Sequence, residues 1–178
     1  MRVFRREDQR TIPWKNGGGV TTELLILPAG ADLDAFELRL SRARVERDGP
    51  FSIFAGVDRS LLVLEGEGMT LDVEGTRVTL RPGDAPFVFA GERAIEATLL
   101  SGPLTDFNVM TRRTALRHEL SWARVEGEAM LSPRGSSLVL AVIEGALGEL
   151  RAGDAAEVDR TTTLRGDARL LRVDLFAA

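Results

Sequence analysis

The chain has 178 residues, 44% hydrophobic and 28% charged, with a formal net charge of -4 and a pI near 5.2. This composition predicts a folded globular protein with one substantial core or two fused halves, and it argues against a disordered chain and against nucleic-acid binding, because no basic face is evident. The absence of cysteine excludes disulfides, thiolate nucleophiles and thiolate metal sites. No apolar run approaches the roughly 20 residues of a membrane span, and the N-terminal MRVFRREDQR is charged, so we expect a cytoplasmic protein without membrane contact.

Short alternating segments bounded by glycine, proline or aspartate dominate the sequence and predict an all-β protein. The clearest strand is AFELRLSRARVE, residues 35–46. Alternation places Phe36, Leu38 and Leu40 on an apolar face, which we expect to face the core, with Glu37, Arg39 and Ser41 on a face open to water. The residues at 48–50, Asp-Gly-Pro, predict the turn that ends this strand.

Residues 59–92 contain several more short strands, separated by turns such as Glu-Gly and Pro-Gly-Asp. Their length and spacing are typical of a β-sandwich or small barrel. The order VLEGEG, DVEG, LRPGD and FAGE resembles the cupin β-barrel, an RmlC-like jelly roll in which two antiparallel sheets enclose a pocket.

The same order returns in residues 138–159, where LRAGD stands in place of LRPGD. The repetition predicts an internal duplication, that is, a bicupin forming one compact unit over residues 1–178. We expect the first barrel to cover about 1–113 and the second half 114–178. A chance agreement of turn residues is the alternative explanation.

Metal-binding cupins use two or three histidines with a carboxylate, and this chain has one histidine, His118, in a predicted strand. A histidine-based metal site is therefore excluded within one chain, whereas a carboxylate site for magnesium or calcium is left open. We predict no cofactor and no role for His118 as ligand or base. The KNGGGVTT segment lacks the spacing of a phosphate-binding P-loop, and its glycines predict a tight turn.

Two residue types are so rare that their positions are informative. Lys15 is the only lysine, and Asn16 and Asn108 are the only asparagines. Asn108 lies in DFNVMTRR, a predicted strand, where asparagine is unusual unless its amide has a function. Alternation in that strand turns Phe107 and Val109 toward the core, and puts Asn108 and Met110 on the other face.

The segments PWKNGGGVTTE, LRLSRARVERDGPFSIFAGVDRSLLVLEGEGMTL and DFNVMTRR together resemble the HutD/Ves family, clearly over residues 11–113 and loosely beyond. The resemblance implies a bicupin without the usual metal histidines, found beside histidine-degradation genes. It also implies binding of an acidic metabolite, such as formylglutamate or a relative, that restrains the pathway without catalysis. Leu38 departs from the aromatic residue that many members carry, which leaves open whether the pocket wall, and so the ligand, is the same.

These observations predict a non-catalytic site for a small acid, in which fixed cations and amides bind a carboxylate through charge-assisted hydrogen bonds. The candidate ligand-binding residues are Lys15, Asn16, Arg39, Ser41, Arg59, Asn108 and Met110. One alternative is a metal-independent isomerase, epimerase or hydrolase with Lys15 as base and Asp48 or Asp58 as its partner. Another is an interaction protein that uses its outer surface, and unpaired sheet edges make a homodimer plausible.

Overall fold

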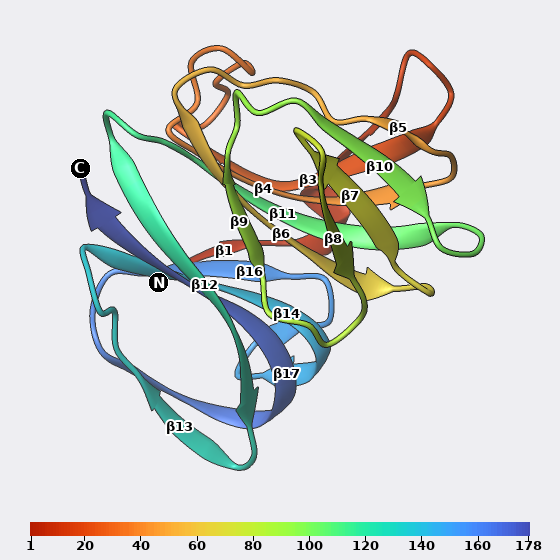
Figure 1. The fold of residues 1–178 in the computed structure, drawn as a ribbon. Helices are drawn as coiled ribbons and strands as arrows, with labels where there is room; N and C mark the ends of the chain where they lie inside the picture. Colours follow the sequence, from red (N-terminus) through yellow and green to blue (C-terminus); the bar gives the residue numbers. More distant parts are fainter. The chain divides into compact units, whose positions relative to one another are not determined.

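The computed structural model describes residues 1–178, and its elements are β-strands apart from a three-residue 3-10 helix, η1 (Arg6–Asp8) (Figure 1). The chain divides into two compact units, one of residues 10–114 and the other of residues 1–9 with 115–178. The expected all-β, cupin-like jelly-roll architecture is confirmed.

The first unit consists of two antiparallel sheets. The larger sheet has six strands, in the order β2 (Arg10–Pro13), β3 (Gly19–Leu27), β4 (Leu38–Val45), β11 (Leu104–Arg112), β6 (Val57–Glu65) and β9 (Phe87–Ala90). The smaller has four, in the order β5 (Gly49–Pro50), β10 (Ile95–Leu99), β7 (Met69–Val73) and β8 (Thr76–Leu80). Apolar side chains from both sheets join in one core cluster, so the sheets pack face to face.

The inner face of the larger sheet is the face that the sequence pattern assigned to solvent. Ala43 and Val45 of β4 and Leu104 of β11 belong to the core cluster shared with the smaller sheet. Alternation therefore turns Arg39 and Ser41 inward as well, and both are buried. The prediction of a wet face here was wrong, because both faces of this sheet are buried and apolarity alone does not identify the inner one.

Both faces of β11 are buried in the same way. Leu104 and Asn108 lie an even number of residues apart and share the inner face, whereas Phe107 and Val109 occupy the opposite face, where each is 0% exposed. The expectation that Phe107 and Val109 are core residues is confirmed by their burial, but they do not belong to the cluster between the two sheets. On the inner face of β11, the end at Leu104 is apolar, whereas the end at Asn108 is polar.

The second unit is built around a sheet ordered β1 (Arg2–Phe4), β16 (Ala155–Val158), β14 (Ser137–Leu147), β17 (Thr162–Ala177) and β12 (Leu116–Val125). Two short strands extend it: β13 (Glu128–Leu131) pairs with β17, and β15 (Leu150–Arg151) pairs with β14. We had assigned the N-terminal residues to the first half. The structure corrects this, because Val3 of β1 pairs with Ala156 of β16 and residues 1–9 belong to the second unit.

The two Leu-Arg-x-Gly-Asp segments form the same hydrogen-bonded turn. In the first, the N–H of Arg81 donates to the Asp84 carboxylate (2.7 Å) and the N–H of Asp84 donates to the Arg81 carbonyl (3.2 Å). In the second, the corresponding distances between Arg151 and Asp154 are 3.0 and 2.9 Å. Each turn places its glycine at positive φ, +92° and +96°. The sequence repeat is therefore also a repeat of local structure.

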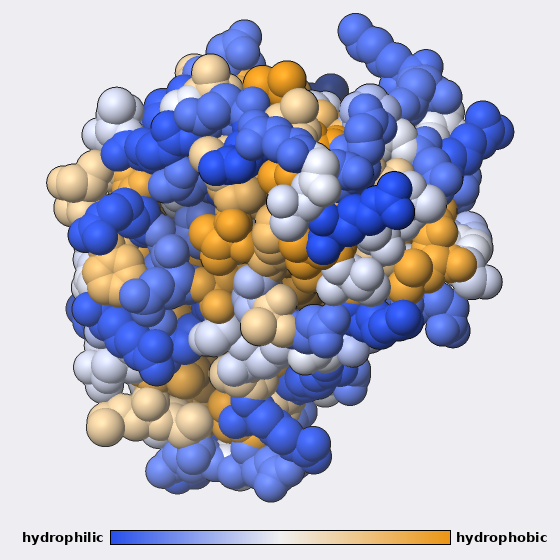
Figure 2. Space-filling view, viewed as in Figure 1, coloured by the Kyte–Doolittle hydropathy of each residue, from blue (hydrophilic) through white to orange (hydrophobic).

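Charged and polar residues cover most of the face shown in Figure 2, with apolar residues visible between them. The large hydrophobic residues that are exposed, such as Ile53, Val88 and Met130, come from separate parts of the chain. No helix of the structure is long and apolar enough to cross a membrane.

Candidate functional site

Five of the seven predicted site residues lie together on the inner face of β4, β11 and β6. Met110 of β11 is directly opposite Arg39 of β4 on one side and Arg59 of β6 on the other. In the neighbouring row, Asn108 is opposite Ser41. Opposed residues of adjacent strands lie about 5 Å apart, so the two guanidinium groups, the amide and the hydroxyl belong to one buried polar cluster.

Arg59 is the cation of this cluster that has no carboxylate partner. It is 4% exposed, and burial lowers the pKa of its guanidinium to about 10. Its Nη1 donates to the carbonyl of Ser52 at 3.0 Å, and its Nε lies 3.4 Å from Oδ1 of Asn108. Both partners are neutral, so the positive charge is not compensated by an ion pair.

Three aromatic rings surround the same guanidinium. Its Cζ lies 5.2 Å from the ring centre of Phe51, 5.6 Å from that of Phe54 and 4.9 Å from that of Phe89. Cation–π attraction stabilises a guanidinium at such distances and replaces part of the lost hydration. The rings also exclude water, which strengthens the attraction between Arg59 and any anion that reaches it.

Arg39 differs from Arg59 because a carboxylate compensates its charge. The Nε of Arg39 donates to Oε2 of Glu23 on β3 at 2.8 Å, and the two side chains are only 10% and 18% exposed. Its Nη1 lies 4.0 Å from the sulfur of Met110. The neighbouring guanidiniums are therefore unequal, with one already paired and the other available to a ligand.

Asp106 lies one row deeper on the same face of β11 and is 2% exposed. Burial, only partly opposed by the charge of Arg59 and a hydrogen bond from the backbone of Ala43, raises the pKa of this carboxyl to about 7. Its Oδ1 has no hydrogen-bond partner. A buried carboxyl with an unsatisfied oxygen is unusual in a folded protein. It indicates a place where a hydrogen-bond partner from outside the protein can bind.

Lys15 and Asn16 do not join the cluster. They lie in the exposed turn between β2 and β3, and β3 leaves that turn with Gly19 opposite Val45, at the far end of β4 from Arg39. Six residues of strand correspond to about 20 Å. Oδ1 of Asn16 accepts the N–H of Gly18 at 3.0 Å, so this side chain shapes the turn. The turn that the sequence predicted for these two residues thus lies apart from the buried cluster.

The carboxylates that the enzyme alternative required are also engaged elsewhere. Asp58 accepts a hydrogen bond from Nε of Arg113 at 2.6 Å, and Asp48 accepts the backbone N–H of Leu99 at 2.8 Å. Lys15 is exposed in the turn between β2 and β3, and neither carboxylate's hydrogen-bond partner lies in that turn. The geometry thus provides no paired general base of the kind that we considered.

The second unit satisfies its own buried charge internally. Asp174 is 1% exposed and accepts two hydrogen bonds from Arg172, at 2.6 and 2.7 Å, and one from the backbone of Arg134 at 2.9 Å. Although burial opposes its ionisation, these bonds hold the pKa of Asp174 below its usual value. No uncompensated guanidinium comparable to Arg59 results.

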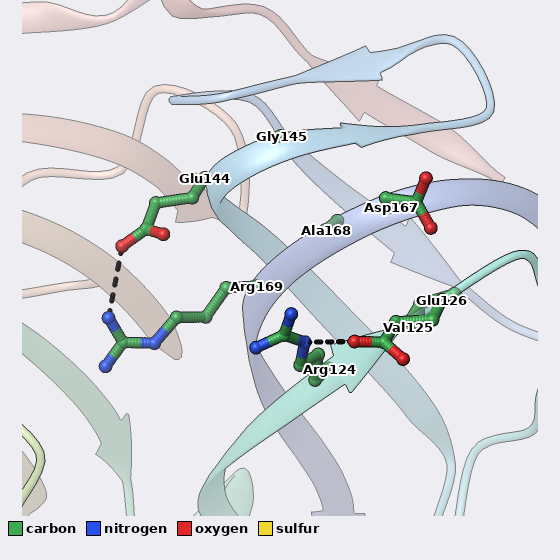
Figure 3. Close-up of a pocket in the computed structure, with 8 residues that line it drawn as sticks. All are labelled: Arg124, Val125, Glu126, Glu144, Gly145, Asp167, Ala168 and Arg169. Carbon is green, nitrogen blue, oxygen red and sulfur yellow. Dashed lines mark hydrogen bonds and ion pairs between the residues drawn. The ribbon is translucent and has the colours of Figure 1, made fainter.

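A hollow of about 470 Å³ opens on the surface of the second unit, along β12, β14 and β17 (Figure 3). Its charged side chains pair with each other, Arg169 with Glu144 at 3.1 Å and Arg124 with Glu126 at 2.7 Å. These four side chains are between 41% and 76% exposed. Paired and hydrated charges give little affinity to a further ion, so this hollow is a weaker candidate than the buried cluster.

No group of three or more His, Cys, Asp or Glu side chains is placed to hold a metal ion. His118 is half-buried on β12 in the second unit. The carboxylate metal site that the sequence left open has no cluster of ligands in the structure.

Sequence reasoning missed five residues around this cluster, namely Glu23, Phe51, Phe54, Phe89 and Asp106. The period of two in DFNVM contains a signal for Asp106, because residues 106, 108 and 110 must share a face. The aromatic residues at 51 and 54 belong to DGPFSIF, which we had treated only as a turn. Glu23 was predictable only from the pairing of β3 with β4.

Comparison with known proteins connects the chain to a family. The HutD family model matches residues 6–174. An uncharacterised 21.2 kDa protein in the hutC 3' region of Pseudomonas putida is 40% identical over 141 residues, covering 79% of this chain and 72% of that protein. Protein Ves of Cronobacter sakazakii is 36% identical over 135 residues, covering 75% and 71%.

Solved structures agree with this relationship. PA5104 of Pseudomonas aeruginosa PAO1, a conserved protein of unknown function, superposes with a TM-score of 0.89 at 35% identity and 98% coverage of both chains. HutD from Pseudomonas fluorescens SBW25, in a formate condition, gives 0.83 at 31% identity, covering 99% of this chain and 98% of that one. YhhW of Escherichia coli, at 10% identity and a TM-score of 0.71, shares the fold alone. The chain belongs to the HutD family.

Proposed function

We propose that this protein binds a small carboxylic acid in its first unit, with the carboxylate on Arg59, and that binding has a regulatory rather than a catalytic role. The acid is an intermediate of histidine degradation such as formylglutamate or a close relative. The observation that carries the proposal is the buried, aromatic-enclosed guanidinium of Arg59, whose hydrogen bonds go to neutral groups and whose charge is opposed only at a distance by the buried Asp106 carboxyl.

A buried cation that forms no ion pair is costly, because proteins usually compensate a buried charge by a directly bonded partner. The free energy lost by burying Arg59 is therefore recovered when an anion arrives. Nη1 and Nε of Arg59 donate to neutral oxygens, the Ser52 carbonyl and the Asn108 amide. A carboxylate approaching the guanidinium would form charge-assisted hydrogen bonds, which are about twice as strong as neutral ones.

Solvent reaches the cluster at its edges, which gives an acid a route of approach. Arg39 and Asn108 each remain 8% exposed, and the Glu23 side chain is 18% exposed. Ser41 and Asn108 supply a hydroxyl and an amide beside the two guanidiniums. Such groups orient a ligand that is first attracted by charge.

The regulatory role is supported by family relationships and by the absence of a paired base beside Arg59. The Pseudomonas putida relative is encoded in a hutC 3' region, and a structural relative is named HutD. A protein associated with histidine utilisation that recognises an acid but lacks a general base would report the level of that acid rather than consume it.

The test is a calorimetric titration of the whole chain with formate, glutarate and N-formyl-L-glutamate. We expect at least one of these acids to bind, and Arg59→Gln to weaken it by about 10- to 100-fold, because a hydrogen bond to a charged group contributes roughly 1.5 to 3 kcal/mol. Arg44→Gln is the matched control, because Arg44 lies on β4 with a 54% exposed side chain paired to Glu46.

Three results would overturn the proposal. One is that none of the acids binds; the second is that Arg59→Gln binds as tightly as the wild type. The third is that the protein consumes a bound acid. NMR of the incubated mixture monitors the acid, and its disappearance would show that the protein catalyses a reaction. Circular dichroism shows whether Arg59→Gln and Arg59→Lys are folded, and the second variant keeps the positive charge. A variant that is folded but does not bind the acid has lost binding rather than folding.

A further inference from the structure

The Asp106 side chain has one oxygen satisfied and one unsatisfied. The backbone N–H of Ala43 bonds one carboxyl oxygen, and Oδ1 has no partner although the residue is 2% exposed. Buried polar atoms are nearly always hydrogen-bonded, so a second partner for Oδ1 is expected when the protein is in its functional state.

The charged groups that share this interior with Asp106 are few. From the larger sheet they are Arg59 of β6, Arg39 of β4 and Glu23 of β3, of which the last two pair with each other. The strands of the smaller sheet contribute only apolar side chains to the facing core, namely Met69, Leu71, Val73, Val78, Leu80, Ile95, Ala97 and Leu99. No side chain of the protein donates to or accepts from Oδ1.

We propose that Asp106 is a second recognition group of the acid site, whose unpartnered Oδ1 donates a hydrogen bond to an oxygen atom of the acid held by Arg59. The inference rests on the proposed function and adds a ligand class to it. The ligand is a carboxylic acid that carries a second oxygen acceptor, such as a carbonyl, amide or second carboxyl oxygen.

Strand geometry sets the distance between the two recognition points. Nε of Arg59 lies 3.4 Å from the Asn108 amide, and Asp106 is two residues from Asn108 on the same face of β11. Two residues of strand span about 7 Å. A chain of four to five carbons between the carboxylate and the second oxygen therefore matches the spacing, whereas formate alone reaches only Arg59.

The donor must be the protonated carboxyl. Burial favours that form, and the raised pKa of Asp106, about 7, agrees with it. A carboxylate bound at Arg59 adds a second negative charge to the same apolar interior, which disfavours ionised Asp106 further. Above pH 7 the complex must therefore take up a proton from solution, while below pH 6 the proton is already present.

The experiment compares hexanoate with 5-oxohexanoate, which differ by one carbonyl oxygen. We expect the wild type to bind the oxo acid about tenfold more tightly, the effect of one additional hydrogen bond. Asp106→Leu should remove this preference while hexanoate still binds, and Asp106→Asn, which retains a donor, should keep it.

Proton uptake provides an independent readout. Calorimetry at pH 8 in two buffers of different ionisation enthalpy should show close to one proton taken up per 5-oxohexanoate by the wild type, and none by Asp106→Asn. Equal affinity for the two acids, or proton release, would overturn the role of Asp106 while leaving Arg59-dependent binding intact. If neither acid binds although formate, glutarate or N-formyl-L-glutamate does, this inference fails and the proposed function stands; if none of the five acids binds, both fail.

Discussion

Arg39 and Glu23 form an ion pair of 2.8 Å inside the first unit, and this pair distinguishes Arg39 from the uncompensated Arg59 two strands away. Because both side chains of the pair are mostly buried, each depends on the other for compensation. The pair decides which of the two guanidiniums is available to a ligand.

Replacing Glu23 by glutamine should destabilise the protein and strengthen acid binding. The variant leaves Arg39 as a second uncompensated cation in the interior, and we expect a loss of about 1 to 3 kcal/mol in the free energy of unfolding. Glu46→Gln is the control, because its pair with Arg44 is half exposed and should change stability by less than about 1 kcal/mol. Urea unfolding measures the stability of both variants. Equal stabilities for the two variants would show that the Glu23 pair is not a buried interaction.

The stability of the unliganded protein should fall between about pH 4 and pH 7 because of Asp106. Its folded pKa of about 7 lies above the unfolded value near 4, so the native state binds the extra proton in this range. The stabilisation is complete below the unfolded pKa and is lost as pH rises through the folded pKa, by roughly 2 to 4 kcal/mol.

Urea midpoints measured at intervals across that range should therefore decline in the wild type. In Asp106→Asn the decline attributable to this group should be absent, because the amide does not titrate. If the two pH profiles run parallel, Asp106 does not carry the proton that we assign to it.

The two repeated turns should respond differently to loss of their aspartate. Asp154 accepts the backbone N–H groups of Arg151 and Arg6 at 3.0 and 2.9 Å and pairs with Arg5 at 3.1 Å. Asp84 is exposed, and its carboxylate accepts only the N–H of Arg81. We expect Asp154→Ala to cost about 2 to 4 kcal/mol and Asp84→Ala about 0.5 to 1 kcal/mol in thermal or urea unfolding.

The pH dependence of the Asp154 contribution has the opposite sign to that of Asp106. Burial opposes its ionisation, but the hydrogen bonds from Arg151, Arg6 and Arg5 outweigh this and hold the pKa of Asp154 below its usual value. Its stabilisation is therefore present above the unfolded pKa and is lost as pH falls through the folded pKa. A difference between Asp154→Ala and wild type that stayed constant down to pH 2 would contradict this assignment.

Two of the three glycines after Lys15 and Asn16, Gly17 and Gly19, should differ in their tolerance of alanine. A Cβ on Gly19 would lie 2.2 Å from the carbonyl oxygen of Arg44, whereas Gly17 has open space but a φ of +68°. Gly17→Ala should cost about 1 kcal/mol from backbone strain alone. Gly19→Ala must separate β3 from β4 and should cost clearly more. Thermal unfolding of the two variants checks the order, and the reverse order would show that the close approach at Gly19 is not needed.

Local chemistry accounts for what the sequence determined by itself. The period of two grouped Arg39 with Ser41 and Asn108 with Met110, since alternation along one strand requires no knowledge of its neighbours. The two Leu-Arg-x-Gly-Asp turns were readable because their hydrogen bonds join residues three apart. Family resemblance supplied the jelly-roll architecture, and the comparisons confirmed it.

Strand pairing decided the rest. Only the register of β11 with β4 and β6 places Met110 between Arg39 and Arg59, and only the register of β3 with β4 carries Lys15 to the other end of the sheet. The inner face was decided by which side of the larger sheet packs against the smaller one, and that depends on contacts between residues far apart in the chain. Rarity of a residue type, as with Lys15, contains no such information, because it says nothing about distance.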